Sequence, residues 1–170
     1  MTFAMAEGLV NAINAYLAAN ISAKLTALNT EYADSITLLA PTATYKGPKS
    51  LTTIPEYPVL YIISTTQSLR PWQVSGTSAV SENKPRVYVG IVVLDSVWEN
   101  LHLRLYRYAR AIVELLLDAQ GAFSLDNWNL GTDEEWEVDT ETTPFETDTR
   151  GSQFLGEVSV AFRANKVETK

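Results

Sequence analysis

The chain contains no cysteine, a single histidine and no hydrophobic run approaching the roughly 18 residues that cross a bilayer. The absence of cysteine excludes disulfide bonds and thiolate metal sites, which fits a reducing compartment. The first basic residue is Lys24, so the N-terminus lacks the charged start of a signal peptide. We therefore expect a protein made in a cytoplasm, with no membrane partner.

Basic residues are also scarce, since 13 Lys and Arg stand against 20 Asp and Glu and leave a formal net charge of -7. The average field of such a chain repels nucleic acid and anionic membrane. Hydrophobic residues make up 46% and charged residues 19% of the sequence, which is typical of an ordered globular protein. The 170 residues predict a single domain, 1–170.

Catalytic and metal-binding patterns are missing as well. The one histidine, His102, stands between Leu101 and Leu103 in a helical pattern, and we interpret it as a packing or hydrogen-bonding residue. No dinucleotide fingerprint, phosphate-binding loop or nucleophile elbow occurs, and the carboxylates lack the spacing of a calcium loop. We predict no enzyme activity, no cofactor and no metal; an enzyme site built from carboxylates alone stays open as an alternative.

Two helices stand out by their periodicity. Leu and Ile recur at steps of three or four through the first 29 residues, which predicts an amphipathic helix. Residues 98–121 predict a second helix, ended by Gly121 and apolar on nearly every side. One flank of this second helix suits the chain's own sheet, and a second flank is left for the first helix or another subunit to cover. The first flank contains Leu101, Leu105, Tyr108, Ile112, Leu115 and Ala119, and the second contains Leu103, Tyr106, Val113 and Leu117.

Four strands are predicted around the second helix. Residues 57–64 and 86–95 are apolar on both alternating faces, which predicts inner strands covered on two sides. Trp136 and Val138 alternate with acidic residues, and residues 154–164 alternate in the same way, which predicts two strands with one exposed face. The sequence thus predicts an α+β fold: an antiparallel sheet of about four strands with two long helices packed on one face. The predicted order is helix, strand, strand, helix, strand, strand.

Two long connectors interrupt this pattern. Residues 30–56 read as an extended connector with a short strand at 36–39, and residues 65–85 read as a polar loop. Connectors of this length in a small domain are commonly functional or ordered by a partner. The aromatic residues Tyr45 and Trp72 are the candidates for docking partners.

Two charged rows are candidates for contacts between chains. Arg104, Arg107 and Arg110 form a basic row on the second helix, which is either a solvated stripe or a surface that meets carboxylates of another chain. Residues 129–148 contain eight carboxylates and no basic residue. Surfaces of opposite charge on one small protein suit a head-to-tail ring. The acidic candidates are Glu135, Glu137, Asp139 and Glu141.

An N-terminal helix leads to a strand that opens with Tyr57-Pro58 and continues "VLYII"; then "VYVGIVVLD" gives way directly to a long helix. The chain closes with an acidic hairpin that ends in the apolar strand "FLGEVSVAFRA". This layout resembles that of the tail-terminator and head-tail joining proteins of tailed bacteriophages, and the resemblance covers nearly the whole chain.

This resemblance implies a non-enzymatic virion protein, assembled in the host cytoplasm into a ring that is commonly a hexamer. Such a ring caps the tail-tube protein, joins it to the head-connector or neck proteins, and lets DNA pass without specific binding. The acidic row is the candidate for the channel surface, because an electronegative wall does not hold phosphates. The long connectors equally suit an adaptor or stopper ring of the neck. A non-viral interaction module that works through its long loops is the remaining alternative.

Overall fold

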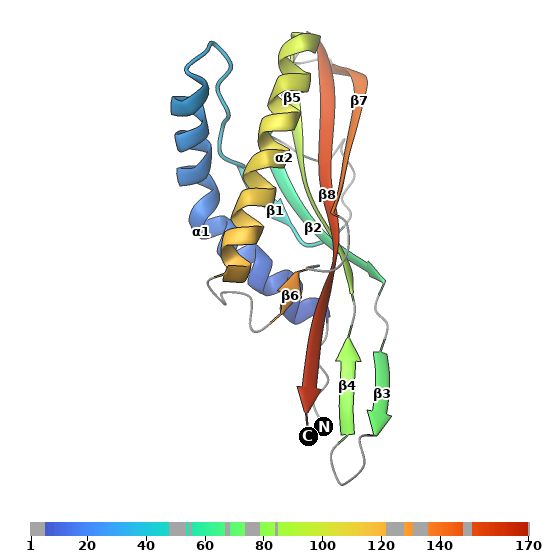
Figure 1. Cartoon of the computed structure of the whole chain (residues 1–170). Helices are drawn as coiled ribbons and strands as arrows, with labels where there is room; N and C mark the ends of the chain where they lie inside the picture. Colours follow the sequence, from blue (N-terminus) through green and yellow to red (C-terminus); the bar gives the residue numbers. More distant parts are fainter. Residues whose placement is uncertain are drawn as a thin grey trace.

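In the computed structural model, two helices lie on one face of a mixed β-sheet, and a narrow β arm extends beyond them (Figure 1). The predicted α+β class is confirmed. The structure describes residues 6–47, 54, 56–66, 69–73, 79–83, 85–121, 128–130, 136–147 and 151–169.

The first helix, α1, runs from Ala6 to Tyr32, which confirms the helix predicted from the periodicity. Its apolar positions all face the core. The buried residues are Leu9, Ile13, Leu17, Ile21, Leu25 and Leu28. The helix ends where Ala33 takes a left-handed backbone conformation with φ of 48° and its N–H donates to the carbonyl of Asn29.

The second helix, α2, runs from Trp98 to Gly121, as predicted. The whole flank assigned to the chain's own sheet is buried: Leu101, Leu105, Tyr108, Ile112, Leu115 and Ala119. The helix lies close to the sheet at Gly156, where an added Cβ would stand 2.7 Å from Leu101 Cδ1 and 2.9 Å from Leu105 Cδ1. Glycine at 156 therefore sets how closely the helix and the sheet can approach.

The main sheet consists of five strands in the order β1-β2-β5-β8-β7. β1 pairs with β2 in parallel, and the other neighbours are antiparallel. β8 is the longest strand, and the two-residue strand β6 also pairs with it. The bounds are Ala43–Tyr45 for β1, Val59–Thr66 for β2, Arg86–Asp95 for β5, Asn129–Leu130 for β6, Glu137–Thr147 for β7 and Gly151–Thr169 for β8.

The predicted order of elements is wrong because of β1. This strand adds a third main-sheet strand before α2 and makes the sheet mixed, so the order of the two helices and the five main-sheet strands is helix, three strands, helix, two strands. A strand of three residues is too short to show an alternation of apolar and polar residues in the sequence. β1 is held by its backbone pairing with β2 and not by a local sequence preference.

The strand predicted at 36–39 is also wrong. This segment is irregular, because side chains instead of a neighbouring strand satisfy its backbone. The Asn29 amide donates to the carbonyl of Leu38 and accepts from its N–H, at 3.0 and 2.8 Å. The Tyr108 hydroxyl accepts from the N–H of Leu39 at 2.9 Å and lies 2.8 Å from its carbonyl oxygen. Both helices thus fix the connector in place.

The polar loop predicted at 65–85 is instead a β-hairpin. β3, Leu69–Gln73, continues the course of β2, and β4, Ala79–Asn83, leads into β5; the two strands pair with each other. β4 also pairs with the end of β8 through residues 166–169. The three strands form the arm that reaches beyond the helices in Figure 1.

The two strands predicted to be inner strands, β2 and β5, do lie inside the sheet, but on the sheet face opposite the helices they are covered only in part. A small cluster of Ile54, Val59, Val92 and Leu155 is buried on this outer face. Farther along the same face, Tyr61, Ile63 and Tyr88 are half-buried and Thr65 is exposed. The outer face therefore changes from a buried patch to an open surface.

Candidate functional site

The basic row of α2 binds carboxylates of its own chain. Arg107 forms a bidentate pair with Asp34 and donates to the carbonyl of Ile36. Its guanidinium carbon lies 3.9 Å from the ring centre of Tyr32. Only 7% of Arg107 is exposed, so the solvated-stripe alternative is wrong for this residue. Arg107 fastens the connector after α1 to the second helix.

The two flanking arginines also have internal partners. Arg104 Nε lies 3.2 Å from Asp95 Oδ2, as an ion pair without the alignment of a hydrogen bond. Arg110 donates to Glu31 and Glu114, each at 2.7 Å. The predicted contact between this row and carboxylates of another chain remains a prediction, and such a contact would have to compete with these pairs.

The ion pairs of Arg107 and Arg110 shift the pKa values of Asp34, Arg107 and Glu114. The hydrogen bond from Arg107, with a second one from the backbone N–H of Ile36, lowers the pKa of Asp34 to about 2. Asp34 in turn raises the pKa of Arg107. Lys24 and Arg110 lower the pKa of Glu114. Asp34, Arg107 and Glu114 are therefore charged at neutral pH.

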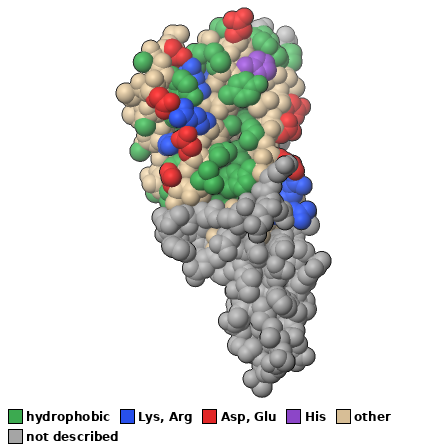
Figure 2. Space-filling model, in the orientation of Figure 1, with side chains coloured by type: hydrophobic (Ala, Val, Ile, Leu, Met, Phe, Trp, Pro, Cys, Tyr) green, Lys and Arg blue, Asp and Glu red, His purple; other side chains and the backbone are tan. Residues whose placement is uncertain are grey.

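The second apolar flank of α2 is open to solvent along most of its length. Leu103, Tyr106 and Leu117 are 46%, 60% and 51% exposed, whereas Val113 is half-buried against the core. Figure 2 shows hydrophobic side chains gathered on this side of the body, next to the one histidine. α1 therefore leaves three of the four residues of this second flank uncovered.

The acidic row lies on the outer face of β7. Glu137, Asp139 and Glu141 are exposed and pair in register with Ala161, Ser159 and Glu157 of β8. Glu135 lies outside the described residues. The Arg86 guanidinium pairs with Glu137, and the Cβ positions of this row share the outer face with the open part of the sheet.

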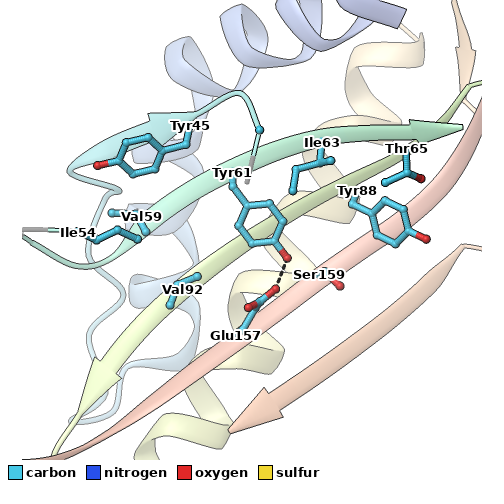
Figure 3. A pocket seen from close by; sticks show the side chains of 11 residues that line it. Tyr45, Ile54, Val59, Tyr61, Ile63, Thr65, Tyr88, Val92, Glu157 and Ser159 are labelled. Atoms are coloured by element: carbon cyan, nitrogen blue, oxygen red, sulfur yellow. Dashed lines mark hydrogen bonds between the residues drawn. The ribbon is translucent and has the colours of Figure 1, made fainter. Parts of the chain in front are cut away.

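A cavity of about 460 Å³ lies on that outer face, between β1, β2, β5 and β8 (Figure 3). Tyr61 extends from β2 across β5 and donates its hydroxyl hydrogen bond to Glu157 of β8. Burial, together with the neighbouring Glu157 carboxylate, raises the pKa of Tyr61 above its usual range, so the hydroxyl stays protonated. We call this cavity the Tyr61 pocket. Its lining residues are Tyr45, Gly47, Ile54, Val59, Tyr61, Ile63, Thr65, Tyr88, Val92, Glu157 and Ser159.

The Tyr61 pocket depends on Gly90, which pairs in register with Tyr61 on one side and Ser159 on the other. An added Cβ at 90 would stand 2.3 Å from the Tyr61 ring and hydroxyl, so only glycine lets this ring lie across β5. Tyr61, Tyr88 and Glu157 were not among the site residues predicted from the sequence. A glycine in the middle of the apolar run "RVYVGIVVLD" is the signal of close approach that could have pointed there.

The two residues proposed for docking partners lie on separate parts of the fold. Tyr45 lies on β1 and lines the Tyr61 pocket. Trp72 lies on β3 of the arm, in register with Val80 of β4, and its side chain is outside the described part of the chain. Their role in docking partners remains a prediction.

Within the described residues, no group of three or more histidines or carboxylates could hold a metal ion. His102 contacts the Trp98 ring edge-on, with ring centres 4.8 Å apart. No described helix is long and apolar enough to cross a membrane.

No protein-family model matches the chain, and no curated protein matches it. The features that bear on function are therefore the exposed flank of α2, the acidic row of β7 and the Tyr61 pocket.

Proposed function

We propose that this chain is the subunit of a closed structural ring in the tail or neck of a tailed bacteriophage, where it ends the tail tube and joins it to the head connector. The observation that carries the proposal is the uncovered second flank of α2. Leu103, Tyr106 and Leu117 are all about half exposed on a helix whose other apolar flank is fully buried. Apolar surface of this kind, bordered by charged residues, marks a contact with another protein.

The β arm supports assembly independently of the helix. It consists of β3, β4 and the end of β8, and it extends away from the layer of helices that covers the body (Figure 1). A ribbon of so few strands gains stability when another layer packs on it, so packing against a neighbour would stabilise the arm. An arm that reaches into the next subunit or ring fits both a terminator and an adaptor or stopper of the neck.

The acidic row supports a channel that does not hold DNA. Asp139 and Glu141 are exposed on β7, and Glu157 lies beside them on β8. Negative charge on an inner surface repels phosphates, so DNA could pass without binding. In this arrangement the outer face of β7 would line the central hole.

Native mass spectrometry of the purified protein at micromolar concentration tests the proposal. We expect a closed oligomer, a hexamer or another fixed ring, in equilibrium with the monomer. Because ring closure uses every interface, intermediate species should be weakly populated. A monomer at every concentration and salt, or an open series of oligomers without a preferred size, would contradict a closed ring.

A further inference from the structure

The Tyr61 pocket combines aromatic rings with one carboxylate in a way that the proposed ring does not require. Tyr45, Tyr61 and Tyr88 come from three different strands, and Figure 3 shows the Tyr61 ring between the other two. Glu157 reaches the same cavity from β8. The pocket is therefore bordered by several π faces with a negative charge at one end. At the end formed by Tyr88, the Arg86 guanidinium, which pairs with Glu137, already lies over the Tyr88 ring, 5.3 Å from the ring centre.

Glu157 has unused capacity to accept hydrogen bonds. One of its oxygens accepts the Tyr61 hydroxyl, and a carboxylate can accept about four hydrogen bonds in all. Among the described residues, no Lys or Arg forms an ion pair with Glu157. Since the side chain is half-buried beside apolar residues, an incoming cation would gain both a partner and a site of lowered dielectric.

The charge around the pocket favours a cation as well. Asp139 and Glu141 of β7 stand next to Ser159 and Glu157 in register and are exposed. An anionic ligand would be repelled by this cluster. A purely apolar ligand would bury the Glu157 carboxylate with only the Tyr61 hydroxyl as a partner and no compensating positive charge, which costs free energy.

We propose that the Tyr61 pocket binds the guanidinium group of an arginine that lies between apolar residues in an extended segment of a partner protein. The planar guanidinium stacks on the tyrosine faces and forms two parallel hydrogen bonds to the carboxylate, which an ammonium cannot do. Ile54, Val59 and Val92 provide apolar contacts for the flanking side chains. The cavity volume of about 460 Å³ admits an arginine side chain together with part of its neighbours.

Equilibrium binding of three short peptides tests the site. The probes are acetyl-Ser-Val-X-Val-Ser-amide carrying an uncharged fluorophore, where X is arginine, lysine or citrulline, and the readout is fluorescence anisotropy. Citrulline keeps the shape of arginine without its charge. We expect the arginine peptide to bind at least about tenfold more tightly than the citrulline peptide, with the lysine peptide between them.

Two variants of the pocket and one control locate the binding. Glu157→Gln keeps an oxygen for the Tyr61 hydroxyl but removes the charge, so it should weaken the arginine peptide about tenfold and leave the citrulline peptide unchanged. Tyr88→Leu should weaken the arginine peptide about threefold to tenfold through loss of a π face. Asp118→Asn removes one exposed carboxylate from α2, away from the pocket, and should change nothing.

Equal binding of the arginine and citrulline peptides, no effect of Glu157→Gln in a folded protein, or no binding of any peptide up to millimolar protein would each overturn the proposal. Circular dichroism of each variant establishes that it is folded. The ring could still form in all of these cases, because the pocket and the α2 flank lie on opposite faces of the sheet. The outcome is therefore separate from that of the proposed function.

Discussion

Charged substitutions on the second flank of α2 should abolish assembly without unfolding the subunit. In the double variant Leu103→Lys with Leu117→Lys, the aliphatic part of each lysine side chain can still make the contacts of the buried half of the leucine that it replaces. Its ammonium group points to solvent. The two leucines are 46% and 51% exposed, so the monomer loses little. Surface changes of this kind typically alter the free energy of unfolding by about 0.5 kcal/mol or less each.

The cost to an interface is much larger. Full burial of a leucine side chain contributes about 1.5–3 kcal/mol, so covering the exposed half of each would contribute about 1 kcal/mol. Losing both contributions weakens each contact by about 2 kcal/mol, or roughly thirtyfold, before any cost of burying the ammonium groups. Since every subunit of a ring repeats the change, assembly should be lost at micromolar concentration.

Sedimentation velocity measures the assembly, and urea unfolding at a concentration below assembly measures the monomer. Asp118→Lys places a lysine on the same helix outside the flank and should leave assembly intact. Leu105→Ala, at a fully buried position of the opposite flank, should lower the free energy of unfolding by about 2–5 kcal/mol. Unchanged assembly of the double lysine variant, or a loss of monomer stability as large as that of Leu105→Ala, would refute the reasoning.

Three further predictions concern contacts within the subunit. Gly156→Ala should lower the free energy of unfolding by about 1–3 kcal/mol in urea titrations, because the added Cβ overlaps two leucines of α2; an unchanged midpoint would mean that the helix moves away freely. Arg107→Met should reduce the fall in the free energy of unfolding between about pH 4 and pH 2. The pKa of Asp34 is lowered to about 2, so the stabilisation from its carboxylate is complete above its ordinary pKa near 4 and is lost as the pH falls toward 2. Urea unfolding of both proteins between pH 2 and 7 checks this, and parallel curves would contradict it. Tyr108→Phe should cost about 1–2 kcal/mol through its lost hydrogen bonds to the connector, whereas Tyr106→Phe, at an exposed position, should cost almost nothing in the same assay; equal effects would show that the connector is not held by Tyr108.

The two helices could be predicted because their signals are local. The periodic apolar positions of α1 and α2 fall on the buried faces, and Gly121 marks the end of α2. The strands β2, β5, β7 and β8 could be recognised for the same reason. What could not be predicted depends on pairing between distant segments: β1 exists through its contact with β2, and the arm exists because β4 pairs with the end of β8.

The candidate site shows the same division. The second apolar flank of α2, with Leu103, Tyr106 and Leu117, could be recognised from the helical wheel, but the sequence left open whether the first helix or another subunit covers it. The partners of Arg107 could not, because Asp34 reaches it only after the connector folds back along α2. The Tyr61 pocket requires the register of four strands, which no local pattern specifies.

Negative-stain electron microscopy of the unmodified protein tests the central claim most directly. A ring built through the α2 flank predicts annular particles of uniform diameter with a stain-filled central hole. The same preparation of the Leu103→Lys and Leu117→Lys double variant should contain only small particles of subunit size. Small particles alone for the unmodified protein, at every concentration and salt at which it is folded, would contradict the ring.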